Sequence, residues 1–262
     1  MTLSKLKLAV LGALVVPMTS VLAEEAPAAE SASEFSYSAN VGLYSDYIFR
    51  GYTQTKHQPA IQGGFDLEHS SGFYAGIWGS NVEWTTESGY MTDNSLEIDI
   101  YGGYATEVAG VGVDVGVLQF IYPGDYAEGS KIDSEATEIY LGLSKDFGAF
   151  SAGLTTYYVV SSEAWQFAEM DGETYVSLDV DVPVGPLTAS FHVGHQTFAE
   201  GKGGNAADLD YTDWKVNVEY PLNDNFAVGA FYTDTDMNKT NWTVNNEYLG
   251  ESVGGAYLSA SF

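Results

Sequence analysis

Apolar side chains recur at every second position along most of this 262-residue chain. In the first such stretch, Phe35, Tyr37, Ala39, Val41 and Leu43 alternate with small or polar residues. A period of two places successive side chains on opposite faces of a β-strand. Both faces of the third stretch carry apolar residues, which leaves its facing open. Twelve stretches are predicted as strands: 35–43, 61–67, 73–84, 96–100, 111–117, 139–143, 150–160, 176–182, 187–193, 214–220, 226–234 and 252–262.

The connections between these stretches alternate in length. Five are short (70–72, 109–110, 147–149, 183–186 and 222–225), and six are longer (50–58, 85–93, 123–135, 162–172, 199–210 and 237–249). Both chain ends then fall on the side of the short turns. This is the layout of a transmembrane antiparallel up-and-down β-barrel, with short periplasmic turns and longer extracellular loops.

A soluble β-sandwich also alternates, but three features favour the barrel. Strands of about ten residues match a tilted bilayer crossing, whereas soluble strands average about five or six. The chain ends in an alternating apolar strand closed by Phe262, which resembles the C-terminal signal that presents outer-membrane proteins to the barrel-assembly machinery. Aromatic residues near the strand ends predict two interfacial girdles: Phe35, Tyr104, Phe150, Tyr220 and Phe226 by the short turns, and Tyr47, Tyr158, Trp214 and Tyr232 toward the long loops.

The N-terminus predicts export. Residues 1–23 read as a signal peptide, with Lys5 and Lys7 before an apolar stretch and cleavage near Ala23. Residues 24–34 form an acidic, small-residue segment that we expect to be flexible, and 35–262 form the barrel. The predicted location is the bacterial outer membrane.

Charge and cysteine content exclude several functions. The mature chain has 7 basic and 36 acidic residues, a formal charge of −29, which repels nucleic acid and bare anionic lipid. No cysteine is present, so the chain can form neither a thiolate metal site nor a thiolate nucleophile.

Three motifs carry a family resemblance: SDYIFRG at 45–51, PAIQGG at 59–64 and GFYAGIWGSN at 72–81. The chain resembles the TorF-type family of proteobacterial porin-like proteins, most densely over 35–105. The resemblance implies an outer-membrane barrel, and it supplies neither a substrate nor catalytic residues.

Enzymatic interpretations are weak. His192 and His195 are three apart on a strand and so point to opposite faces, which prevents chelation of one metal. The spacing of His69 and Ser71 resembles that of outer-membrane phospholipases, but it falls in a short turn. The segment 234–238 resembles the opening of a calcium loop, yet Lys239 replaces its glycine. We expect no enzyme activity, metal or cofactor.

Arg50 is the single arginine of the chain. Counting from Phe35, odd positions face lipid, so Asp46 and Arg50 face the lumen, with Arg50 near its extracellular mouth. Two roles are open: pairing with Asp46, Asp66 or a loop carboxylate to pin a constriction, or contact with an anionic group of a solute. The predicted pore-lining residues are Asp46, Arg50, Asp66, Glu68, Asp99, Asp114, Glu138, Asp179, Asp181, His192 and Glu219.

The function predicted from these features is a porin-like channel for passive passage of small solutes, with a cation preference set by the acidic lumen. The alternatives are a plugged structural or partner-binding barrel and, with less support, an outer-membrane lipid hydrolase. Expected partners are outer-membrane lipid, small solutes and, through Phe262, the assembly machinery.

Overall fold

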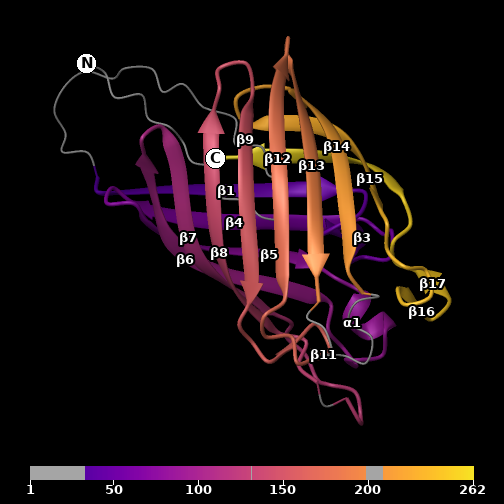
Figure 1. The fold of residues 1–262 in the computed structure, drawn as a ribbon. Coiled ribbons are helices and arrows are strands. Elements are labelled where there is room, and N and C mark those ends of the chain that lie inside the picture. The colour runs from indigo at the N-terminus through magenta and orange to yellow at the C-terminus, as the bar shows by residue number, and fades with distance from the viewer. Residues whose placement is uncertain (1–32, 131, 199–208) are drawn as a thin grey trace.

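The structure is a computed structural model that describes residues 33–130, 132–198 and 209–262. The predicted signal peptide and residues 24–32 of the acidic segment lie outside these ranges. Twelve long antiparallel strands close into one barrel, so the predicted fold class is confirmed. In Figure 1 the strands of the near wall cross those of the far wall, as they do in a tilted barrel. The strands are β1 (Phe35–Tyr44), β4 (Ala60–His69), β5 (Phe73–Asn81), β6 (Leu96–Val108), β7 (Val111–Ile121), β8 (Ala136–Asp146), β9 (Ser151–Val159), β12 (Thr174–Val184), β13 (Leu187–Thr197), β14 (Tyr211–Pro221), β15 (Phe226–Thr235) and β18 (Val253–Ser261).

Each strand pairs with its neighbour in chain order, and β1 pairs with β18 to close the barrel. The closing register runs from Asn40 opposite Ser261 to Tyr44 opposite Tyr257. Beyond it, Phe262 and Ala39 exchange backbone hydrogen bonds of 2.9 and 3.1 Å. No helix in the described ranges has the length and apolar character needed to cross a membrane.

The connections alternate in length as predicted, which gives the barrel a tight-turn end and a long-connection end. The long connections carry short elements of their own: β2 (Ile48–Phe49), β3 (Tyr52–Thr53), α1 (Trp84–Glu87), β10 (Glu163–Ala164), β11 (Phe167–Ala168), β16 (Thr243–Val244) and β17 (Glu247–Tyr248). Several boundaries differ from the prediction. The third strand ends at Asn81 and not at 84, since residues 84–87 form α1, and β6 continues to Val108, beyond the predicted end at 100. Because β1 ends at Tyr44, the first long connection spans 45–59 and not 50–58.

Apolar residues cover the outside of the barrel. On β7, for example, Val115 and Val117 are exposed while Asp114 is buried. The structure also settles the third strand: Phe73 and Ile77 of β5 point outward and Trp78 is buried.

Eight of the nine aromatic residues predicted for the two girdles are exposed, and one is not. The prediction for Tyr47 is wrong, because this residue lies beyond the end of β1 and is 3 % exposed. Counting by twos is valid only while the backbone stays extended.

Tyrosines on the inner face lie flat against glycines. A Cβ added at Gly116 would meet the Tyr140 ring, and one at Gly194 would meet Tyr175. These glycines leave room for a ring to cross to the next strand, and they place tyrosine hydroxyls along the inner wall.

Candidate functional site in the barrel interior

A two-residue hairpin from the first long connection enters the barrel. Its strands pair Ile48 with Thr53 and Phe49 with Tyr52, which leaves Arg50 and Gly51 at the tip. Both tip residues have positive φ, 44° and 89°, as the first and second positions of a type I′ turn require. A left-handed conformation is costly for arginine, so contacts made by its side chain must compensate for it.

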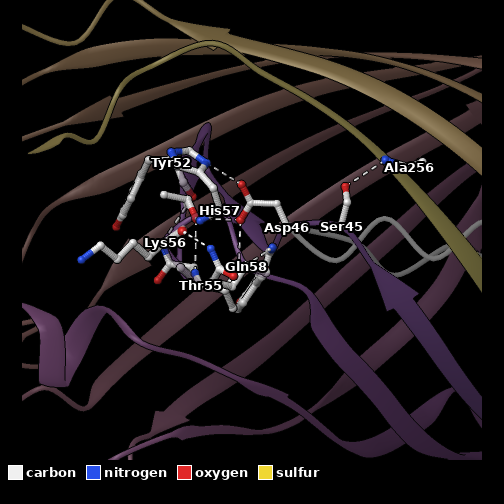
Figure 2. Close-up of polar contacts among 11 residues, drawn as sticks. Ser45, Asp46, Tyr52, Thr55, Lys56, His57, Gln58 and Ala256 are labelled. Atoms are coloured by element: carbon white, nitrogen blue, oxygen red, sulfur yellow. Dashed lines mark hydrogen bonds and ion pairs between the residues drawn. The ribbon is translucent and has the colours of Figure 1, made fainter.

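Asp46 holds the two sides of this connection together (Figure 2). Its Oδ1 accepts hydrogen bonds from the hydroxyls of Thr53 at 2.6 Å and Thr55 at 3.0 Å. Its Oδ2 lies 2.8 Å from Nδ1 of His57. Asp46 is 4 % exposed, and all three of these partners belong to its own loop, which it stabilises.

The loop is also tied to its surroundings. The hydroxyl of Ser45 accepts the Ala256 amide of β18 at 3.0 Å, as Figure 2 shows. The Tyr47 hydroxyl donates to Glu97 of β6 at 2.6 Å. Burial, followed by the charge of Glu97, raises the pKa of Tyr47 well above its ordinary value, so the phenol stays a donor. Lys56 pairs with Glu87 of the second long connection, a hydrogen bond that raises the pKa of Lys56.

Arg50 crosses the interior and pairs with Glu138 of β8. Nη2 lies 2.8 and 2.7 Å from the two carboxylate oxygens, and Nη1 donates to Oε1 of Gln196 on β13 at 3.1 Å. The side chains of Arg50 and Glu138 are 3 % and 0 % exposed. Burial disfavours the guanidinium charge, but Glu138 outweighs this effect and raises the pKa of Arg50.

Aromatic rings complete the Arg50 site. The guanidinium carbon lies 4.4 Å from the ring centroid of Tyr175, 4.8 Å from Phe49, 5.2 Å from Tyr157 and 5.7 Å from Trp165. All four distances are within the range of cation–π attraction.

These contacts correct the partner predicted for Arg50. Neither Asp46 nor Asp66 pairs with it: Asp46 binds its own loop, and Asp66 accepts the Tyr101 hydroxyl at 2.5 Å. The alternative of an anionic solute at Arg50 is not favoured either, because Glu138 and Gln196 already occupy its terminal nitrogens.

The other predicted lining residues sit on strands and alternate with outward apolar residues, so they share the inner face. Their exposure differs from strand to strand. Asp99, Asp114, Glu138 and Glu219 are buried, Asp66, Asp179 and His192 are intermediate, and Glu68 and Asp181 are exposed. That these residues line a conducting pore stays a prediction.

Sequence reasoning missed two inner carboxylates, Glu97 and Asp213, which are 1 % and 2 % exposed. The signal was present in the alternation, since Glu97 precedes outward Ile98 and Asp213 precedes outward Trp214. It also missed the tyrosine hydroxyls that donate to inner carboxylates. Besides the bonds of Tyr47 and Tyr101 described above, these pairs are Tyr74 with Asp114 at 2.7 Å, Tyr175 with Asp213 at 2.9 Å and Tyr257 with Glu219 at 2.9 Å.

His192 lies in a hydrogen-bonded network. Nδ1 is 2.7 Å from Asp179, and Nε2 is 2.9 Å from the Tyr175 hydroxyl and 3.2 Å from Asp213. Within the described residues, no group of three or more histidine, cysteine or acidic side chains has the geometry of a metal site.

The phospholipase-like pair of the first tight turn makes local contacts. Nδ1 of His69 is 2.7 Å from the Ser71 hydroxyl and also accepts the Ser71 amide at 3.2 Å. Glu34 lies 3.6 Å from Nε2, beyond the distance of an orienting hydrogen bond in a catalytic relay. This geometry is that of a hydrogen-bonded turn.

The calcium-like segment also uses its carboxylates locally. Asp234 accepts the Thr235 amide at 2.9 Å, and Asp236 accepts the Thr212 amide at 2.5 Å. These side chains brace the start of the last long connection.

The long-connection end of the interior is packed with apolar side chains. Phe49 of the hairpin contacts Phe120 of β7 and Trp165 of the fourth long connection, with centroids 5.7 and 6.3 Å apart. Tyr52 contacts Trp242 at 5.9 Å. The hairpin therefore packs into this end, and the acidic inner face continues from it toward the tight turns.

The chain is similar to two solved outer-membrane proteins. It superposes on the NanC porin with a TM-score of 0.53 and 12% identity, over 87% of this chain and 99% of that one. It superposes on an outer membrane channel from Pseudomonas putida F1 with a TM-score of 0.50 and 12% identity, over 89% and 99%. At such identity these matches establish the shared fold alone.

Sequence comparison adds one match. Residues 28–262 fit the model of a family described as a bacterial protein of unknown function. No curated protein matches the chain.

Proposed function

This chain belongs to the Gcw_chp family of bacterial proteins of unknown function, and we propose that it is a porin-like channel of the bacterial outer membrane that passes small solutes and prefers cations. That the chain is a member of the TorF-type porin-like proteins stays a finer prediction.

The outer surface supports a membrane location. Every barrel strand presents apolar side chains outward, and aromatic residues such as Tyr220 and Trp214 are exposed near opposite strand ends. A soluble protein rarely exposes an apolar surface of this extent, whereas lipid covers it at no cost. Export by the N-terminal signal, with cleavage near Ala23, delivers the chain to this membrane. Phe262, 67 % exposed at the tight-turn end, is available to the assembly machinery.

The observation that carries the channel proposal is the acidic inner face. The described carboxylates on inward strand positions include Asp66, Glu68, Glu97, Asp99, Asp114, Glu138, Asp179, Asp181, Asp213 and Glu219. Arg50, His192 and Lys215 are the basic residues that share this interior among the described residues. Charges of one sign in a low-dielectric wall concentrate counterions, so this interior favours cations.

The hairpin sets the width of the passage. A twelve-stranded barrel is intermediate between packed eight-stranded barrels and wide porins, and the Arg50 hairpin occupies part of its cross-section. We therefore expect a narrow conductance that depends on the hairpin.

A plugged, partner-binding barrel is the second candidate, and the apolar packing around Phe49, Phe120 and Trp165 favours it. Lipid hydrolysis has less support, because the His69 contacts serve the turn. We expect no enzyme activity.

Planar-bilayer recording separates the two candidates. A channel gives discrete conductance steps and, under a salt gradient, a reversal potential on the cation side. Asp181→Asn, which removes an exposed inward charge, should reduce this preference, while the matched change Asp224→Asn in a tight turn should not. Arg50→Ala should strengthen the preference. Anion preference in the unmodified protein would refute the electrostatic reasoning, and silent membranes with correctly folded protein would favour the plug.

A further inference from the structure

The Arg50 site divides into an occupant and a wall. The occupant is the tip of the hairpin. Four neighbouring strands supply most of the wall: Glu138 from β8, Tyr157 from β9, Tyr175 from β12 and Gln196 from β13. None of these four residues belongs to the first long connection.

The wall has the chemistry of a guanidinium receptor. Glu138 presents both carboxylate oxygens to one cationic nitrogen, and Gln196 presents an amide oxygen to another. Tyr175 and Tyr157 lie against the guanidinium carbon. A carboxylate with aromatic faces is the usual combination for a planar, delocalised cation.

Three of the four wall residues keep contacts of their own when Arg50 is left out, whereas Glu138 loses its hydrogen-bond partner. The Tyr175 hydroxyl is held by Asp213 at 2.9 Å and by His192 at 2.9 Å. The Gln196 amide donates to the Thr197 carbonyl at 3.3 Å, and Tyr157 packs on the rings of Tyr140 and Tyr175. Removing the arginine therefore leaves the two tyrosine rings and the amide in place around a buried carboxylate that has lost its cation.

Arg50 is an imperfect occupant of this site. Its Nε is buried without a hydrogen-bond partner, and its backbone is in the left-handed conformation. An unpaired buried donor and a strained φ each reduce the net stability of the seated hairpin. A free solute has no backbone conformation to strain, so it avoids the second of these costs.

We propose that this wall is a binding site for the guanidinium group of cationic solutes, and that Arg50 is a tethered occupant which such a solute displaces. This role rests on the proposed channel function and assigns cationic guanidinium compounds to it as a solute class. Displacement releases the hairpin tip from β8 and β13, so binding and widening of the passage are coupled.

Competition from a tethered group predicts the sign of the affinity change. A group on a short tether acts as an internal ligand at an effective concentration of about millimolar or more. Arg50→Ala removes this competitor, so the variant should bind a guanidinium solute at least about tenfold more tightly than the unmodified protein.

The experiment is calorimetric titration of methylguanidinium into the detergent-solubilised, folded barrel, with urea as the neutral probe of the same planar shape. We expect binding to Arg50→Ala, weaker but saturable binding to the unmodified protein, and none to Arg50→Ala with Glu138→Gln. Urea should bind none of them. Arg50→Met, which keeps an apolar stem in the site, replaces Arg50→Ala if the latter does not fold.

Two results would overturn the inference. One is absence of methylguanidinium binding to a folded Arg50 variant, which would show that the wall is no receptor. The other is binding to the variant but none to the unmodified protein at about a hundredfold higher concentration, which would leave Arg50 as a permanent structural pin. Both readouts are independent of conductance, so a silent barrel can pass this test and a conducting one can fail it.

Discussion

Loss of the Arg50 side chain should release the hairpin while the barrel stays folded. Arg50→Ala removes both hydrogen bonds to Glu138 and the one to Gln196, and it leaves Glu138, 0 % exposed, without its cation. Removal of one partner from a buried ion pair costs about 3–5 kcal/mol. Because this pair joins the hairpin to the wall, most of that cost falls on the seated state of the hairpin.

The chain lacks cysteine, so one introduced thiol reports hairpin release. Thr53→Cys places it on β3, at a side chain that is 5 % exposed. When closing is fast, the maleimide labelling rate follows the population of the open state. At a factor of ten for about 1.4 kcal/mol, Arg50→Ala should accelerate labelling by about 100-fold to several thousand-fold.

Two variants in the same background control this measurement. Lys56→Ala removes a cation of the same connection, but its pair with Glu87 is exposed, so labelling should change little. Arg50→Ala combined with Glu138→Gln leaves no unpaired buried carboxylate. Its labelling rate should therefore be at least about tenfold lower than that of Arg50→Ala alone. Acceleration of less than about fivefold by Arg50→Ala, or an equal effect from Lys56→Ala, would show that the Arg50–Glu138 pair does not hold the hairpin in place.

Three further outcomes are expected. Val115→Arg, which points outward near mid-strand, should reduce folding into bilayers by about 2–4 kcal/mol, and the inward Ser190→Arg should be better tolerated; equal yields of heat-modifiable barrel would contradict the facing. Gly51→Ala should raise the labelling rate of the Thr53→Cys hairpin, because φ is 89° and a Cβ would lie 2.5 Å from that of Asp213; an unchanged rate would show that the tip is loosely seated. Burial raises the pKa of Tyr52 to about 12, above its ordinary value near 10, so its support for the seated hairpin is complete below pH 10 and declines toward pH 12. Tyr52→Phe should remove that part of the alkaline increase in labelling, and an identical pH profile would exclude Tyr52 as its cause.

The sequence by itself determined the barrel and the facing of all its strands except the third. A strand has a period of two, so the positions of Val115 and Asp114 on opposite faces follow from their order alone. The alternation of short and long connections then predicted the up-and-down order, since short turns can join only adjacent antiparallel strands. The same alternation contained Glu97 and Asp213, so these two inner carboxylates were predictable in principle.

Only the tertiary structure decided where the first long connection goes. The alternation ends at Tyr44, and beyond it the side-chain direction depends on turns such as Arg50–Gly51 that periodicity does not encode. For this reason Tyr47 points into the interior and not to the girdle. The partner of Arg50 was equally out of reach. Glu138 lies 88 residues further along the chain, and barrel closure brings its carboxylate opposite the hairpin tip. A buried arginine must find a carboxylate, but which one it finds is a property of the closed barrel, because several acidic residues share the inner face.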